Sequence, residues 1–403
     1  MLQNKFIPVL LLSAAALVAA GCGNSGGKAI AKLIDENVAN AELQLTSLLE
    51  ASEAGDTLRI PSTFKDDEVC FVPEDDWVSG FFAGTLWYMY ELTGDEMWAA
   101  HAKRHTEALD SVQYLTWHHD VGFMVYDSYG NGLRLTGDGS YRDVLVQTAK
   151  SLSTRFRPGA GVLQSWNTDR GWQSERGWTC PVIIDNMMNL ELLFNASAIS
   201  GDPTYRDIAV SHADKTLANH FREDASCYHV VDYDPGTGEV LHRCTAQGCA
   251  DGSAWARGQA WALYGFTIAY RFTGYERYLQ QARKVAAFIL GHPRLPEDKV
   301  PYWDFDAPDI PDTYRDVSSA AIIASALCEL YSFTDDKSYL DAVDAILASL
   351  STPAYRAEPG TNGGFILMHS VGSLPHGSNI DVPLNYADYY FLEALLRRKA
   401  LLK

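Results

Sequence analysis

Apolar residues recur at intervals of three and four along most of the chain from residue 30 to residue 398, which indicates amphipathic and buried α-helices. Short polar breaks separate these segments. Strands and helices do not alternate regularly, so the pattern disfavours Rossmann folds and TIM barrels. The periodicity predicts helices over residues 30–52, 77–92, 97–114, 141–156, 182–199, 205–221, 253–272, 278–290, 317–331, 339–350 and 383–398.

Several breaks between the predicted helices share one short pattern. Each contains a Gly or Asp with an aromatic residue four positions later, and in most of them an Asp comes directly after that Gly or Asp. These breaks lie at residues 92–98, 199–205, 272–278 and 333–339. A left-handed glycine can end one helix, an aspartate can cap the next, and the aromatic ring can pack across the joint. The repeated unit is therefore predicted to be a helical hairpin.

Helical hairpins of irregular spacing favour a closed ring over an open solenoid, which needs near-uniform repeats. About six hairpins would close such a ring. The β signals are local: residues 228–233 and 239–241, joined by a turn at 234–238, predict a β-hairpin between helices. The acidic residues of this turn lack the spacing of an EF-hand, so a turn is favoured over a calcium site.

The first 21 residues are predicted to be a signal peptide. Lys5 precedes an apolar stretch at residues 6–20 that is too short to span a bilayer as a mature helix and ends in small residues. Residues 17–22 resemble a bacterial lipoprotein box, in which Cys22 is lipidated and residues 22–29 form a flexible tether. The alternative is ordinary cleavage with an incidental cysteine.

In either case we expect an exported protein. With lipidation, it would be a periplasmic or outer-membrane-anchored lipoprotein of a Gram-negative bacterium, touching the membrane only through the anchor at Cys22. The mature chain, residues 30–403, is predicted to be a single domain.

Composition and charge narrow the range of partners. The chain is 47% hydrophobic and 21% charged, as in ordinary globular proteins, and 32 basic residues against 51 acidic ones give a net charge of -19. This charge argues against a nucleic-acid partner. It would also repel an anionic small substrate, so a site for one must supply its own Arg or His. The oligomeric state stays open.

The sequence lacks the motifs of several enzyme classes. It contains no G-x-S-x-G, H-E-x-x-H or Walker motif, so serine hydrolases, zinc proteases and P-loop enzymes are disfavoured and no cofactor is predicted. The six cysteines after Cys22 form no C-x-x-C pair and have no His at zinc-finger spacing. We therefore predict no metal site, and thiols that are mostly free and buried.

Asp185 is a polar residue inside an otherwise apolar predicted helix, with Asn189 one turn later on the same face. An ionised carboxylate is costly to bury, so this group must be hydrogen-bonded, paired, or protonated with a raised pKa. The protonated state is what a general acid requires. The alternative is a helix cap near Ile184.

Asp120 is a second candidate carboxylate. It follows His118 and His119 and precedes a Tyr- and Gly-rich segment, residues 126–131, that is predicted to be a loop. Two adjacent histidines do not readily face one ion, so a carboxylate beside a substrate is favoured over a metal site. A purely structural role is the alternative.

Two pairs of residues one helical turn apart suggest a sugar site. Arg257 and Trp261 would place a cation and an indole face together, which suits a carboxylated sugar. Trp77 and Phe81 form an aromatic pair of the same spacing, and aromatic residues make up 12% of the chain with 10 Trp. Core packing is the commoner use of any one aromatic ring.

Six strings of sequence, taken together and in order, resemble the unsaturated glucuronyl hydrolases, glycoside hydrolase family 88. They are residues 77–82, 119–124, 184–191, 253–261, 300–306 and 381–398. The likeness runs from about residue 66 to the C-terminus. It implies an all-α (α/α)6 barrel with short β-hairpin insertions. The implied substrates are glycosaminoglycan-type oligosaccharides that polysaccharide lyases leave with a 4,5-unsaturated uronic acid at the non-reducing end.

The resemblance also implies the chemistry, which is hydration of a vinyl ether. An acid protonates C4, water captures the cation at C5, and the hemiketal opens and releases the remaining saccharide. By position, Asp185 matches the acid and base of the family and Asp120 its second carboxylate. The residues that match the sugar subsite are Trp77, Phe81, His119, His229, Gln247, Arg257 and Trp261.

The chain departs from the family at two places. The family commonly has Thr-His-Gln-Gly-Tyr where this chain has Ala246 and Cys249 in place of the His and the Tyr, which implies a shift in affinity or linkage preference. Ser370 and Ser373 are kept where some members bind a sulfated second sugar. Pro375 stands where those members have Lys, so a preference for sulfated chondroitin is not predicted.

Two other functions remain open at this point. One is an unsaturated rhamnogalacturonyl hydrolase of glycoside hydrolase family 105, which the context of residues 257–261 disfavours. The other is a catalytically silent glycan-binding lipoprotein, which the altered loop at residues 246–252 permits.

Overall fold

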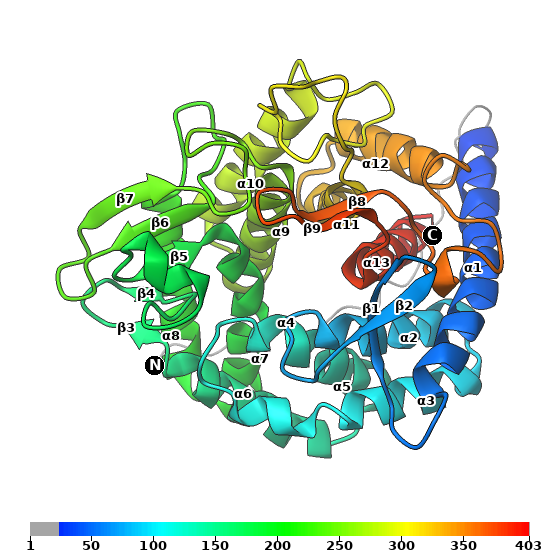
Figure 1. Ribbon diagram of the computed structural model, residues 1–403, viewed down its shortest axis with the longest axis horizontal. Helices are drawn as coiled ribbons and strands as arrows, with labels where there is room; N and C mark the ends of the chain where they lie inside the picture. Colours follow the sequence, from blue (N-terminus) through cyan, green and yellow to red (C-terminus); the bar gives the residue numbers. More distant parts are fainter. Residues whose placement is uncertain (1–23, 403) are drawn as a thin grey trace, which may run out of the picture.

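The structure is a computed structural model that describes residues 24–402. Its helices form a ring, and short β-hairpins project around one end of it (Figure 1). The predicted signal peptide and Cys22 lie outside the described residues.

Six helical segments form the inner ring, and most of their residues are buried. Each contacts the next, and the last contacts the first, so the ring is closed. The inner segments are α2 (Ser79–Thr93), α4 (Val121–Val125) with its continuation through η2 (Tyr126–Gly130) and α5 (Asn131–Thr136), α7 (Leu190–Ser200), α9 (Ala256–Thr273), α11 (Val317–Thr334) and α13 (Asn385–Ala400).

Six outer helices alternate with the inner ones along the chain, and each buries one face against the ring. This alternation confirms the predicted (α/α)6 barrel. Because each inner helix follows an outer one of opposite direction, the inner N-termini gather at one end of the barrel. The outer helices are α1 (Asn24–Glu53), α3 (Glu96–Glu107), α6 (Ser140–Ser153), α8 (Pro203–Asn219), α10 (Glu276–Gly291) and α12 (Lys337–Leu350).

The predicted turn between helices is confirmed. Gly94 and Gly201 end α2 and α7 in the left-handed conformation, with φ of 74° and 75°. The side chains of Asp95 and Asp202 then cap α3 and α8 by accepting a backbone N–H two residues later. Asp335 takes the glycine's place at the end of α11, with φ of 55°.

The loop predicted over residues 126–131 is wrong, because the segment is a π-helical turn between α4 and α5. The glycines in this region allow close packing and do not mark a turn. A Cβ on Gly122 would lie 2.3 Å from Asn189 Oδ1, and one on Gly132 would lie 2.6 Å from the Tyr141 ring.

The helix predicted over residues 182–199 is also wrong in its first half. Pro181–Ile183 forms β5, Ile184–Asn189 forms the 3-10 helix η4, and only then does α7 begin. The β5 strand pairs with β6 (Val230–Tyr233), and this tertiary contact outweighs the apolar helical pattern. Residues three apart share a face of a 3-10 helix, so Asp185 and Asn189 do not point the same way.

The predicted β-hairpin is confirmed as β6 and β7 (Val240–Cys244). Its turn is held by the Asp234 carboxylate, which accepts the backbone N–H groups of Gly236 and Thr237 at 2.9 and 2.8 Å. The other strands and 3-10 helices are β1 (Ile60–Lys65), β2 (Glu68–Val72), β3 (Phe156–Arg157), β4 (Val162–Leu163), β8 (Ser370–Ser373), β9 (Ser378–Val382), η1 (Asp110–Tyr114), η3 (Trp172–Arg176) and η5 (Asn362–Gly364).

The structure bears on two further predictions, the N-terminal tether and the free, buried thiols. Helix α1 begins at Asn24, so residues 24–29 of the predicted tether are helical here, and the role of the segment as a tether stays a prediction. The six cysteines of the described residues are free, as predicted, but only Cys180, Cys227 and Cys328 are fully buried.

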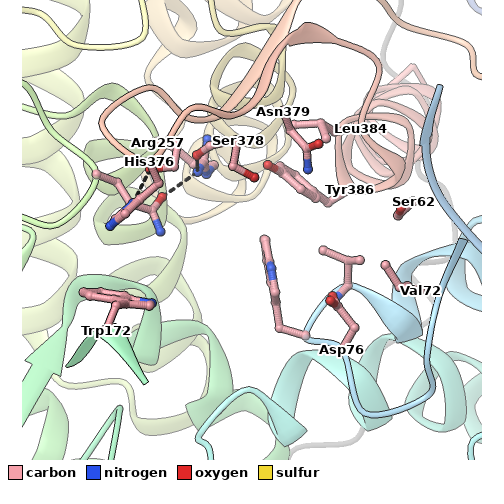
Figure 2. A pocket seen from close by; sticks show the side chains of 15 residues that line it. Ser62, Val72, Asp76, Trp172, Arg257, His376, Ser378, Asn379, Leu384 and Tyr386 are labelled. Atoms are coloured by element: carbon pink, nitrogen blue, oxygen red, sulfur yellow. Dashed lines mark hydrogen bonds between the residues drawn. The ribbon is translucent and has the colours of Figure 1, made fainter. Parts of the chain in front are cut away.

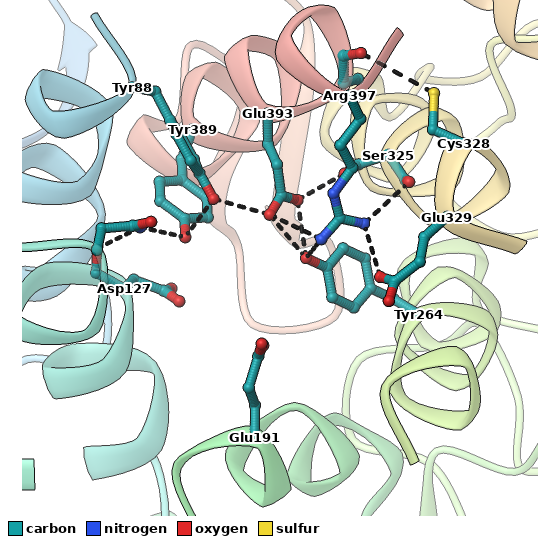
Figure 3. Close-up of polar contacts among 12 residues, drawn as sticks. Tyr88, Asp127, Glu191, Tyr264, Ser325, Cys328, Glu329, Tyr389, Glu393 and Arg397 are labelled. Atoms are coloured by element: carbon teal, nitrogen blue, oxygen red, sulfur yellow. Dashed lines mark hydrogen bonds and ion pairs between the residues drawn. The ribbon is translucent and has the colours of Figure 1, made fainter. Parts of the chain in front are cut away.

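A buried polar network joins four inner helices away from the hairpin end (Figure 3). The Glu393 carboxylate on α13 accepts hydrogen bonds from Tyr88 of α2 at 2.7 Å and from Tyr264 of α9 at 2.8 Å. It also accepts from Ser325 of α11 and pairs with Arg397 at 3.0 Å.

Helix α11 is apolar enough to cross a membrane by length and composition, but in the barrel it is largely buried.

Candidate active site

The candidate site lies at the end of the barrel where the inner helices begin. Asp120 immediately precedes α4, Asp185 lies in the short 3-10 helix before α7, and Arg257 is in the first turn of α9. This end holds a cavity of about 320 Å³, a size typical of small-ligand sites. The cavity is lined by Ser62, Val72, Asp76, Trp77, Val78, Trp172, Gln247, Arg257, Gly372, Ser373, His376, Ser378, Asn379, Leu384 and Tyr386 (Figure 2).

Asp185 is buried beside His229. Its Oδ2 atom has no hydrogen-bond partner among residues 24–402 and lies 3.8 Å from His229 Nε2. The other ring nitrogen of His229, Nδ1, accepts the backbone N–H groups of Ala246 and Gln247 at 3.0 and 3.2 Å. Since Nδ1 is an acceptor, the proton of the neutral imidazole is on Nε2 and faces Asp185.

Burial raises the pKa of Asp185 from 3.8 to about 7. The positive charge of Arg257 and the Trp261 indole oppose this rise, and the negative charge of Asp120 adds to it. Burial likewise holds the pKa of His229 well below its ordinary value, so the imidazole is neutral. A carboxyl group that keeps its proton close to neutral pH is suited to general acid catalysis.

Asp120 has the opposite shift. Burial would raise its pKa, but His119, His118 and Arg155 lower it below its ordinary value. Its two oxygens lie 3.3 Å from His119 Nε2 and 3.6 Å from His118 Nδ1. Near neutral pH Asp120 is therefore ionised while Asp185 retains a proton. Two carboxyls with opposite pKa shifts can take different roles, one as the acid and the other as the group that stabilises positive charge.

Arg257 lines the cavity but is almost fully engaged with the protein. Its terminal nitrogens donate to Asp316 at 3.2 Å, to Gln247 at 2.8 Å and to the carbonyls of Val371 and Gly372 at 2.5 Å. The guanidinium therefore holds the β8–β9 hairpin over the cavity and supplies positive charge there. Its direct contact with a substrate carboxylate stays a prediction.

The predicted aromatic residues form two layers. Trp77 is half-buried and lines the cavity, with its ring centroid 5.9 Å from that of Phe81. Phe81 and Trp261 have no exposed surface and pack against Phe123 beneath the cavity. The Trp261 indole lies close enough to Asp185 to lower its pKa, and the stacking of its ring on a sugar stays a prediction.

The structure adds residues that the sequence reasoning missed. Trp172, on η3, contacts His376 of the loop between β8 and β9, with ring centroids 4.9 Å apart. Arg176 lies over both Trp172 and Trp178, at 5.5 and 5.4 Å from their centroids. The signal in the sequence was a set of three Trp in one polar, Gly-containing loop, residues 166–178.

The altered loop at residues 245–249 contributes to the site mainly through its backbone. Ala246 and Gln247 donate their N–H groups to His229, and the backbone N–H of Cys249 donates to Asp304 at 2.9 Å. These contacts do not depend on the side chains of Ala246 and Cys249. The departure from the family pattern therefore leaves the support of His229 intact.

Residues 24–402 contain no group of His, Cys, Asp and Glu arranged to hold a metal ion.

Comparison with known proteins defines the class. Residues 57–294 match Glycosyl Hydrolase Family 88, and the chain belongs to this family, as the sequence predicted. It is therefore a glycosidase with an (α/α)6 barrel.

The similar proteins include unsaturated glucuronyl hydrolases. The chain is 47% identical to the one from Formosa agariphila over 82% of each chain, and 38% identical to the one from a Bacillus species, over 80% of this chain and 86% of that one. A solved unsaturated glucuronyl hydrolase specific for heparin is 46% identical, with a TM-score of 0.87 over 92% of this chain and 98% of that one. A substituted enzyme from Streptococcus agalactiae in complex with dGlcA-GalNAc6S has a TM-score of 0.73 at 28% identity, over 91% of each chain.

Proposed function

We propose that the protein removes the 4,5-unsaturated uronic acid from the non-reducing end of glycosaminoglycan oligosaccharides made by lyases. The observation that carries this proposal is a pair of buried carboxyls with opposite pKa shifts, Asp185 and Asp120. Each lies next to a histidine, at the end of the barrel that holds the cavity. The relatives that bear this activity in their names support it.

In the proposed reaction, protonated Asp185 donates its proton to C4 of the vinyl ether. The positive charge then develops on C5 and the ring oxygen, where ionised Asp120 can stabilise it. Water attacks C5 and returns a proton to Asp185, which ends the cycle as it began. Opening of the hemiketal breaks the bond between C5 and the ring oxygen, and the hemiacetal left at C1 collapses and releases the remaining saccharide.

The electrostatics of the site favour an anionic sugar despite the net charge of -19. The inner helices begin at this end, so the positive ends of their dipoles face the site. Arg257 adds a buried positive charge on the cavity wall. These contributions are local, whereas the acidic surface charges are screened by salt over about 8 to 10 Å.

The test is an ultraviolet assay of the vinyl-ether absorbance with unsaturated disaccharides from heparin and from chondroitin in parallel. We expect the absorbance to fall with at least one of them, and the Asp185→Asn variant to leave it unchanged. If wild-type protein binds these disaccharides and the absorbance persists, the protein is a glycan-binding protein and the proposal is wrong.

We also propose that the protein is exported and anchored through a lipid on Cys22. This proposal is supported by the lipobox-like residues 17–22. Radiolabelled palmitate should enter the wild-type protein in a bacterial host and be absent from the Cys22→Ala variant. Label in both proteins would contradict the anchor.

A further inference from the structure

Asn189, the last residue of η4, is fully buried, and its side-chain amide makes hydrogen bonds to the segment that carries Asp120. Its Oδ1 accepts the backbone N–H of Phe123 at 3.0 Å. Its Nδ2 lies 3.2 Å from His119 Nδ1 and 3.3 Å from Asn186 Oδ1. Because a backbone N–H can only donate, this contact fixes which end of the amide is oxygen, and the NH₂ group must face His119.

The orientation of this amide determines where the imidazole carries its proton. An NH₂ group can only donate, so His119 Nδ1 must be the acceptor, and a neutral ring then carries its proton on Nε2. Burial supports the neutral state, because it lowers the pKa of His119 to about 4. The protonated Nε2 lies 3.3 Å from Asp120 Oδ1, outside hydrogen-bond geometry but close enough for electrostatic attraction.

We infer that Asn189 is a positioning residue, which holds His119 in the Nε2–H tautomer so that a proton, and not a lone pair, faces Asp120. The role rests on the proposed function of Asp120 but concerns the free enzyme. With the other tautomer, a lone pair of His119 would face an ionised carboxylate and repel it. Asp120 would then shift from the position in which the proposed function has it act on the sugar.

The two site histidines are held in different ways. His229 is fixed by two backbone N–H groups, which no side-chain substitution removes. His119 depends on a single side chain for its Nδ1 partner. Gly122 makes this contact possible, since a Cβ there would lie 2.3 Å from Asn189 Oδ1.

The test is nitrogen-15 NMR of the histidine rings in the substrate-free protein. The His119 signals are assigned by their loss in His119→Gln. In wild-type protein we expect an unprotonated Nδ1 and a protonated Nε2. In Asn189→Asp, the carboxylate can still accept from Phe123, but it now presents an acceptor to Nδ1, so this nitrogen should become protonated. We expect kcat to fall by about 10- to 100-fold, as when a partner that orients a histidine is removed, with a smaller change in KM.

The matched control is Asn195→Asp on α7. The Asn195 amide donates to Tyr126 Oη at 2.7 Å and to the Glu191 carbonyl at 3.0 Å, and we expect neither kcat nor the His119 signals to change. A protonated Nδ1 in wild-type His119 would overturn the inference, even if the variant does not fold. So would a folded Asn189→Asp variant whose His119 signals or kcat match those of the wild type. Failure of the proposed function would appear separately, as an inactive wild type.

Discussion

Replacement of Asp185 by Asn should stabilise the protein near neutral pH while it lowers activity by orders of magnitude. The native carboxyl is held in a site that disfavours its ionised form, since burial raises its pKa from 3.8 to about 7 and its Oδ2 has no partner among the described residues. The amide of Asn has nearly the same shape and does not ionise. The substitution therefore removes the cost of burying a charge and leaves the packing almost unchanged.

The sign and size of the effect follow from proton linkage. Between pH 3.8 and about 7 the folded protein holds a proton on Asp185 that the unfolded chain has released. The wild-type free energy of unfolding therefore falls as pH rises through this window. A shift of about three pKa units corresponds to about 4 kcal/mol. The gain in Asp185→Asn should be near zero at about pH 4 and reach at most this value above about pH 7.

The assay is thermal or urea unfolding of both proteins from pH 4 to 8 at constant ionic strength. At an unfolding entropy of about 2.1 cal/mol/K per residue, a gain of about 4 kcal/mol corresponds to roughly 5 °C in Tm. Activity of the variant should fall by about 10² to 10⁴-fold, the usual contribution of general acid–base catalysis. A gain that is absent at pH 8, or equal at pH 4 and pH 8, would refute the reasoning.

Asp388 provides the matched control, because burial raises its pKa to about 7 as well. Unlike Asp185, its two oxygens accept the backbone N–H groups of Ile366 and Leu367, both at 2.9 Å. An amide can accept only one of these. At about pH 4, where neither substitution relieves a buried charge, Asp388→Asn should therefore destabilise the protein by about 1 to 3 kcal/mol for the donor left buried, whereas Asp185→Asn should leave its stability unchanged. The contrast separates a functional buried carboxyl from a structural one.

Three further predictions concern the site and its packing. Asp120→Asn should reduce kcat and move the alkaline limb of the kcat/KM profile to lower pH, because the charge of Asp120 helps to raise the pKa of Asp185; a shift to higher pH would contradict the coupling. Arg257→Ala should raise KM by roughly tenfold to a hundredfold, as expected for the loss of a charge-assisted contact, and an unchanged KM would remove Arg257 from substrate binding. Gly122→Ala should lower Tm and kcat together, since its Cβ would lie 2.3 Å from Asn189 Oδ1, and a variant with wild-type Tm and kcat would show that the contact is not needed.

Much of the barrel could be predicted because its determinants are local. The helix boundaries depend on periodicity and on capping residues such as Asp95 and Asp202, whose carboxylates bond within two residues of themselves. The failures occurred where distant segments meet. Residues 181–183 pair with β6, some 50 positions later, and the glycines near residue 126 accommodate neighbouring side chains, so neither effect is visible in a window of one helix.

The residues of the site were found less completely than the fold. Asp185 and Asp120 stood out because a carboxyl in an apolar or histidine-rich context needs an explanation, and the strings around them resemble those of the family. Trp172 and His376 were missed because they meet only through two loops that are far apart in the sequence. The burial of Trp261, which places its ring in the aromatic layer next to Phe123, was likewise not visible in the sequence.

The sequence by itself determined the helical hairpins, their closure into a ring, the family and the two carboxyls, because periodicity, capping and motif order are properties of neighbouring residues. Only the tertiary structure decided which carboxyl keeps its proton, because a pKa depends on the burial and the charges that the fold assembles around a group. It also decided that Arg257 supports the β8–β9 hairpin and that Asn189 orients His119. The first contact joins residues 114 positions apart and the second joins residues 70 positions apart, so only the closed barrel brings them together.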